Sequence, residues 1–110
     1  MTSVNLHRSG EGSGPPLVLL PPFPFDARLW SRVRSLLTGP VIVVDPPGFG
    51  GAEATGTPSL EAYAQVLLEA LDHVGVDRFV VAGNSMGGYA ALALAALAPQ
   101  RLAGIILIGT

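Results

Sequence analysis

The stretch "VVAGNSMGGYAALAL", residues 80–94, decides how the rest of the chain is interpreted. It begins as an apolar run, passes through Gly83-Asn84-Ser85-Met86-Gly87-Gly88, and continues as a segment rich in alanine and leucine. This order predicts a strand, then a tight turn, then a helix. One serine, Ser85, therefore lies between glycines at the predicted turn.

Short apolar runs rich in branched side chains occur on both sides of this stretch and predict further strands. With the run before Ser85, they are Leu17–Leu20, Val41–Val44, Phe79–Ala82 and Ile105–Ile108. They are continuous rather than alternating, which is typical of parallel strands covered on both faces. An opening run near residues 3–7 predicts either a short first strand or half of a hairpin that turns at residues 9–12.

Helical patterns separate the predicted strands. Asp26 is a candidate cap for a first helix, whose apolar face is Leu29, Trp30, Val33, Leu36 and Leu37. Thr57-Pro58 predicts the start of a second helix and Gly75 its end. The third helix, residues 86–98, is apolar nearly all round and is expected to be buried. The alternation predicts one α/β domain over residues 1–110, with a mainly parallel sheet.

Composition excludes several classes of partner. Only 13% of the residues are charged, the net charge is −2, and all basic residues are arginine, so no basic run predicts nucleic acid binding. The chain has no cysteine, hence no disulfide or thiolate zinc site. The N-terminus lacks the apolar core of a signal peptide. No apolar run approaches the ~20 residues that span a bilayer. We expect a cytoplasmic protein without a membrane partner.

The pattern Gly-x-Ser-x-Gly at residues 83–87 has two interpretations. As a nucleophile elbow, it holds Ser85 on a strained turn between strand and helix, with its hydroxyl above the carboxyl end of the sheet. The glycines are then needed because neighbouring backbone leaves no room for a Cβ. Alternatively, Ser85 is only a helix cap and the glycines only allow close packing. The predicted strand before it and helix after it favour the elbow.

Three blocks together resemble the α/β-hydrolase superfamily, in its single-domain esterase, lactonase and haloperoxidase-like branch. They are "LVLLPPFPFDARLW" at residues 17–30, "VIVVDPPGFGGA" at residues 41–52 and "GNSMGG" at residues 83–88. They occur in the family's order and cover essentially the whole chain. The resemblance implies the N-terminal half of the α/β-hydrolase fold, a mainly parallel sheet flanked by helices, and no metal or organic cofactor.

The resemblance also implies roles for particular residues. Ser85 would be the nucleophile, and the backbone N–H groups of Phe23 and Met86 would form the oxyanion hole. Where the family usually has His-Gly, this chain has Pro21-Pro22. Proline lacks its own N–H but does not remove that of the following residue, so the donor at Phe23 is retained.

In this family the acid and the histidine of the triad follow the nucleophile. No Asp, Glu or His follows Ser85, so we expect both groups to be absent from this chain. The two histidines, His7 and His73, are interpreted as surface residues. Asp45 is expected to satisfy loop N–H groups, and neither it nor Asp26 is expected to have an imidazole to orient.

These observations predict the N-terminal portion of a serine hydrolase that acts on a small ester, lactone or similar acyl substrate. The alternative is a non-catalytic α/β half-domain that serves as an interaction or oligomerisation module through its last strand, residues 102–108. That strand is apolar and would be exposed. In either case we expect self-association, or pairing with a chain that supplies the C-terminal half.

Overall fold

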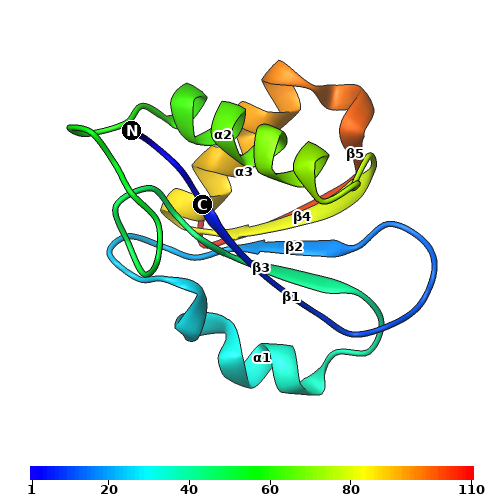
Figure 1. Ribbon diagram of the computed structural model, residues 1–110. Coiled ribbons are helices and arrows are strands. Elements are labelled where there is room, and N and C mark those ends of the chain that lie inside the picture. Colours follow the sequence, from blue (N-terminus) through cyan, green and yellow to red (C-terminus); the bar gives the residue numbers. More distant parts are fainter.

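The computed structural model describes residues 1–110 and contains a five-stranded sheet in the order β1-β3-β2-β4-β5 (Figure 1). The strands are β1 Asn5–Ser9, β2 Leu17–Leu20, β3 Val41–Asp45, β4 Phe79–Asn84 and β5 Leu102–Ile108. All neighbouring pairs are parallel except β1 and β3, which are antiparallel. The predicted α/β class with a mainly parallel sheet is confirmed. The opening strand pairs with β3 and forms no hairpin with β2.

Helices cover both faces of the sheet (Figure 1). They are η1 Ala27–Trp30, α1 Ser31–Leu36, α2 Leu60–His73, α3 Met86–Leu97 and η2 Pro99–Arg101, where η denotes a 3-10 helix. Helices α2 and α3 pack against each other and cover one face, and η1 with α1 covers the other. The longest of them, α2, has 14 residues, and none is long and apolar enough to cross a membrane.

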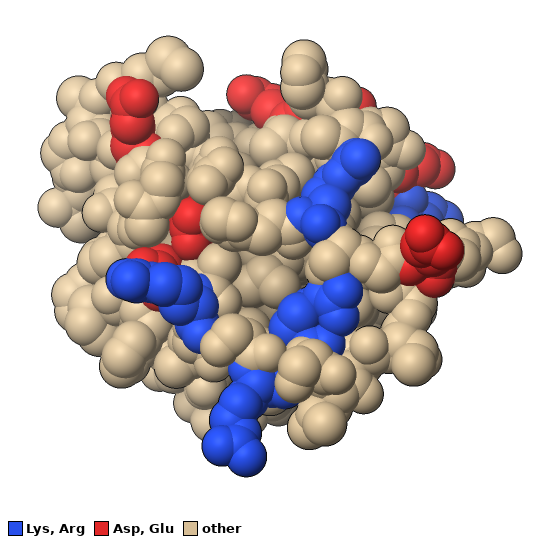
Figure 2. Space-filling view, turned by 60° about the horizontal axis from the view of Figure 1, so that its bottom comes forward, with Lys and Arg blue, Asp and Glu red and all other residues tan.

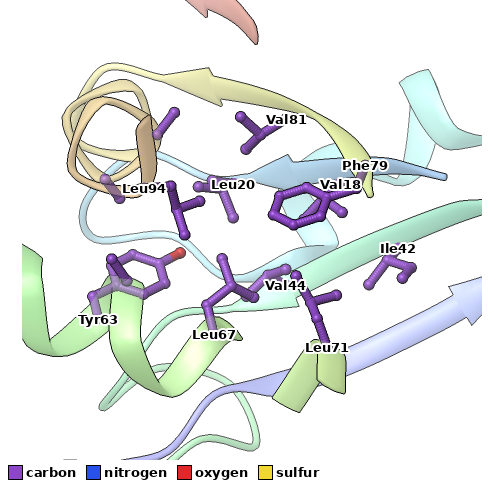
Figure 3. Close-up of a cluster of buried hydrophobic side chains, with 13 residues drawn as sticks. Val18, Leu20, Ile42, Val44, Tyr63, Leu67, Leu71, Phe79, Val81 and Leu94 are labelled. Carbon is purple, nitrogen blue, oxygen red and sulfur yellow. The ribbon is translucent and has the colours of Figure 1, made fainter. Parts of the chain in front are cut away.

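The strands contribute side chains to a separate core on each face, as expected for a sheet covered on both sides. The larger core lies between the sheet and helices α2 and α3 (Figure 3). It contains Val18, Leu20, Ile42, Val44, Tyr63, Ala64, Leu67, Leu71, Phe79, Val81, Ala90, Ala91 and Leu94. The smaller core lies under η1 and α1 and contains Leu19, Trp30, Val41, Val43 and Ala82.

Two helix starts differ from the prediction. Asp26 accepts a hydrogen bond from the Arg28 N–H, but the helix it caps is the short η1, and Leu29 and Val33 remain exposed. The second helix begins at Leu60 instead of at Pro58, because the Ser59 hydroxyl accepts a hydrogen bond from the Ala62 N–H at 3.0 Å. Ser59 is therefore the N-cap of α2, which the pattern Thr57-Pro58 did not identify.

The expectation that the third helix is buried all round is wrong. Its inner face packs tightly through Gly87, Gly88, Ala90, Ala91 and Leu94. The face turned away from α2 and the sheet exposes Tyr89, Leu92 and Leu97. Strand β5 is likewise exposed over Ile105–Ile108, as expected, since it forms the edge of the sheet beyond β4.

Candidate active site

Ser85 alone connects β4, which ends at Asn84, to α3, which begins at Met86. Its backbone has φ 54° and ψ −112°, and it is the one residue other than glycine with a positive φ. L residues rarely adopt this conformation, and it costs about 1–3 kcal/mol. Ser85 is exposed at the carboxyl end of the sheet. Strand, turn and helix thus place a strained serine where α/β folds bind their ligands.

The glycines on either side of Ser85 are required by close backbone contacts. A Cβ on Gly83 would overlap the Gly87 carbonyl and the Gly88 nitrogen, and a Cβ on Gly87 would overlap the Leu20 carbonyl. All of these are backbone atoms, which cannot rotate away. The small residues at these positions are therefore part of what holds the turn.

Hydrogen bonds fix the backbone of Ser85 but leave its side chain free. Its N–H donates to the Ile108 carbonyl at 2.9 Å, and its own carbonyl accepts from Gly88 N–H at 2.9 Å and Tyr89 N–H at 3.2 Å. The Thr110 hydroxyl also donates to this carbonyl, at 3.3 Å. The Ser85 hydroxyl makes no capping hydrogen bond. The interpretation of Ser85 as a conventional helix cap is therefore wrong.

Phe23 and Met86, the two backbone donors implied by the resemblance, line one cavity of about 210 Å³ beside this turn. The lining comes from the segments after β2 and β3 and from the starts of α2 and α3. It comprises Phe23, Pro46, Pro47, Phe49, Thr57, Pro58, Ser59, Leu60, Tyr63 and Met86. Met86 is the first residue of α3, so its N–H has no acceptor within that helix.

The segment after β2 leaves the N–H of Phe23 without a backbone partner. The Pro22 carbonyl accepts from the Phe25 N–H at 2.8 Å, which closes a turn around Phe23. The N–H of Phe23 takes part in none of the backbone hydrogen bonds. The two prolines are thus compatible with a free donor at this position.

Asp45, at the end of β3, lies in a network of four donors. Its carboxylate accepts from Ala27 N–H at 2.8 Å, Gly51 N–H at 3.1 Å, Asn5 Nδ2 at 3.2 Å and His7 Nε2 at 2.8 Å. Burial alone would raise the pKa of Asp45, but these hydrogen bonds outweigh it and hold the pKa below its usual 3.8. The expected role of Asp45 in satisfying loop N–H groups is confirmed.

The expectation that Asp45 has no imidazole to orient is wrong, because His7 binds it. The antiparallel pairing of β1 with β3 places Asn5 opposite Asp45, and His7 two residues further on the same face. Alternation along the opening strand indicates that Asn5 and His7 share a face, but it does not identify the strand with which they pair. The side chain of His7 is 52% exposed, and it lines a cavity of about 710 Å³ beside α1. Arginine side chains gather on this face, with acidic side chains among them (Figure 2).

Neither histidine is hydrogen-bonded to Ser85. In the strand order, β1 and β4 are three strand spacings apart, which corresponds to roughly 14 Å. His73, the last residue of α2, is exposed and makes no side-chain hydrogen bond, as expected for a surface residue. The structure therefore places Phe23 and Met86 on one cavity, with Ser85 directly before Met86 in the chain. His7 lies three strand spacings from β4.

Comparison with known proteins agrees with this geometry. A family model described as "alpha/beta hydrolase fold" matches residues 15–110. The chain belongs to this family. Its resemblance to the N-terminal half of the fold is also confirmed by a solved esterase from Thermogutta terrifontis, with a TM-score of 0.88 and 36% identity. That match covers 96% of this chain and 40% of the esterase.

Two curated relatives illustrate the range of proteins that this chain resembles. The chain is 41% identical over 98 residues to a pimeloyl-[acyl-carrier protein] methyl ester esterase of Aromatoleum aromaticum. It is 39% identical over 104 residues to a dihydrolipoyllysine-residue acetyltransferase component of the acetoin cleaving system of Pseudomonas putida. These matches cover 87% and 92% of this chain, but only 37% and 28% of the relatives. The chain thus spans well under half the length of the relatives it matches.

Proposed function

We propose that this chain is the N-terminal part of a serine hydrolase that acts on a small ester, lactone or similar acyl substrate. The observation that carries the proposal is the conformation of Ser85, an exposed serine with φ 54° on a strand-to-helix turn. Its hydroxyl makes no capping bond, and the cavity beside it is lined by Phe23 and Met86. Strain at a non-glycine residue persists only where the surrounding structure enforces it.

In the proposed reaction, Ser85 Oγ attacks the acyl carbon and passes its proton to a histidine. The carbonyl oxygen becomes an oxyanion, which the N–H groups of Phe23 and Met86 stabilise at the N-terminus of α3. The intermediate collapses, the C–O bond breaks, and the alcohol leaves with the proton. Water then attacks the acyl group on Ser85, aided by the same histidine, and releases the acid and the free serine. One oxyanion donor contributes about 10²–10³-fold in rate.

The base and its acid are proposed to come from sequence that the longer relatives share beyond the matched region. A serine hydroxyl needs such a base, and the base needs an orienting acid. His7 and Asp45 form such a pair, but they lie on β1 and β3, which are three and two strand spacings from β4. The esterase names of the bacterial relatives support an ester as the substrate class. A cytoplasmic location remains a prediction of the composition.

The test is labelling with a fluorophosphonate, which reacts with activated serines. The full-length protein, including the segment that completes the family's domain, is expected to be labelled at Ser85. Ser85→Ala should lose the label. Ser35→Ala is the matched control and should keep it, because Ser35 is an exposed serine on α1 whose hydroxyl donates to the Arg32 carbonyl. A full-length protein that stays unlabelled, or labelling that survives Ser85→Ala, contradicts the proposal.

A second candidate role, as an interaction module, is favoured by one observation. Strand β5 is an edge strand, and its residues Ile105, Ile106, Leu107 and Ile108 are each at least 40% exposed. An apolar strand with an unpaired edge pairs readily with another strand. We propose that β5 mediates self-association or pairing with the C-terminal half. Sedimentation at micromolar concentration should show association that Ile106→Lys reduces, and a wild-type monomer would contradict this role.

A further inference from the structure

The cavity beside Ser85 contains no charged side chain. Its ten lining residues are apolar, aromatic or proline except for two hydroxyl side chains, Thr57 and Ser59, and the phenol of Tyr63. Of these, Ser59 is already bound to the Ala62 N–H. Phe23 and Phe49 form an edge-to-face pair, with ring centroids 5.6 Å apart and planes at 88°. Phe23 is nevertheless 66% exposed, so most of its surface is free to contact a ligand.

One negative charge, that of Asp45, acts on the lining of this cavity. Burial raises the pKa of the Tyr63 phenol, and the negative charge of Asp45 raises it further, so Asp45 acts on a residue of the lining. The start of α2 also borders the cavity, and a helix N-terminus attracts anions. Here, however, Glu61 lies in the first turn of α2 and supplies that negative charge from within the chain. A carboxylate entering the cavity would meet no cation among the lining residues.

The size of the cavity limits what it can hold. An apolar cavity of about 150 Å³ accommodates benzene, and this one measures about 210 Å³. One aromatic ring or a short acyl chain therefore fits. An apolar group gains free energy there by leaving water, whereas a carboxylate would lose hydration and find no cation among the lining residues to pair with.

We propose that the group bound in this cavity is uncharged and apolar, so that the site takes neutral esters in preference to esters that carry a carboxylate. The inference deepens the proposed function, since it concerns the same site. Phe23 and Phe49 supply the aromatic contacts, and Leu60 borders the cavity at the start of α2. The residues that line this cavity determine the preference, and it does not depend on which residues supply the base.

The test compares the binding of methyl benzoate and monomethyl terephthalate, which differ by one carboxylate on the ring. The full chain carrying Ser85→Ala is titrated with each, and backbone amide shifts are followed by NMR. Methyl benzoate should shift the amides of Phe23, Phe49 and Leu60, and bind at least about tenfold tighter than monomethyl terephthalate, a difference of about 1.4 kcal/mol. Equal or tighter binding of the carboxylate, shifts elsewhere, or no binding at millimolar concentration would overturn the proposal.

A charge variant separates electrostatics from shape. Leu60→Arg in the Ser85→Ala background adds a cation at the cavity. It should increase the affinity for monomethyl terephthalate, relative to the affinity for methyl benzoate, by at least about threefold. Leu97→Arg is the matched control, because it adds the same charge on the exposed face of α3. If Leu60→Arg folds and the ratio of the two affinities is unchanged, the result counts against the proposal. If Leu60→Arg does not fold, the comparison of the two esters in Ser85→Ala decides the test. Because Ser85→Ala cannot react, these results are independent of labelling at Ser85.

Discussion

The strained backbone at Ser85 makes an unusual prediction about stability: Ser85→Gly should be more stable than Ser85→Ala. At an ordinary position the order is reversed, because glycine has more freedom to lose on folding, about 0.4–1 kcal/mol. At Ser85, with φ 54° and ψ −112°, glycine relieves about 1–3 kcal/mol of strain that alanine retains. The difference leaves Ser85→Gly more stable than Ser85→Ala by about 1 kcal/mol.

Removing the hydroxyl should itself have little effect, since it makes no capping bond and the residue is exposed. Ser85→Ala is therefore expected within about 0.5 kcal/mol of the wild type. The matched control is Ser31, an exposed serine with ordinary helical angles, φ −58° and ψ −38°. There, Ser31→Gly should be less stable than Ser31→Ala by about 0.5–1 kcal/mol.

Urea unfolding, followed by the fluorescence of the single tryptophan, measures these differences. Trp30 is 5% exposed and should report the loss of the smaller core. All five proteins, wild type included, should have the same slope with urea, so that the midpoints compare directly. If both serines show the same order, with alanine above glycine, then Ser85 stores no backbone strain and the main support for the proposed nucleophile is lost.

Other predictions concern packing, charge and capping. Gly83→Ala should lower the free energy of unfolding by at least about 2 kcal/mol, because its Cβ meets backbone; Gly104→Ala in β5, which meets only ordinary side-chain contacts, should not. Asp45→Asn should be destabilising at neutral pH. Because the folded pKa of Asp45 is lowered, that deficit should shrink as the pH falls below about 4, measured by urea unfolding across pH. Ser59→Ala should remove a helix cap worth about 1 kcal/mol in thermal or urea unfolding.

Each of these has an outcome that contradicts it. Equal stabilities of Gly83→Ala and Gly104→Ala would show that the turn has room for a Cβ. A deficit of Asp45→Asn that stays constant between neutral pH and pH 3 would mean that the carboxylate hydrogen bonds contribute nothing. Ser35→Ala is the control for Ser59→Ala, and equal effects would remove the capping argument.

The sheet and the turn could be predicted from sequence because their signals are local. Continuous branched runs predicted four of the five strands to within a few residues, and glycine spacing predicted the bend at Ser85. The close contacts of Gly83 and Gly87 with backbone explain why that spacing is informative. The pattern predicts the turn even though the sequence does not show which backbone atoms contact either glycine.

What could not be predicted depends on pairing between distant residues. The bond between His7 and Asp45 follows from the antiparallel register of β1 on β3, and nothing local predicts which strand an opening segment joins. The exposed face of α3 was missed for a similar reason. Its apolar residues predicted burial, but burial is decided by what packs on each face, and α2 and the sheet cover only one.

The bonds that Ser85 makes to the end of β5 also determine when its turn can form. Its N–H is held by Ile108 and its carbonyl by Thr110, residues that leave the ribosome more than twenty positions later. Until Ile108 and Thr110 are in place, the turn lacks these hydrogen bonds, and nothing from β5 holds Ser85 in its strained conformation. The geometry proposed for Ser85 is thus completed only after Ile108 and Thr110 have been made, when the helix that follows Ser85 already has its full sequence.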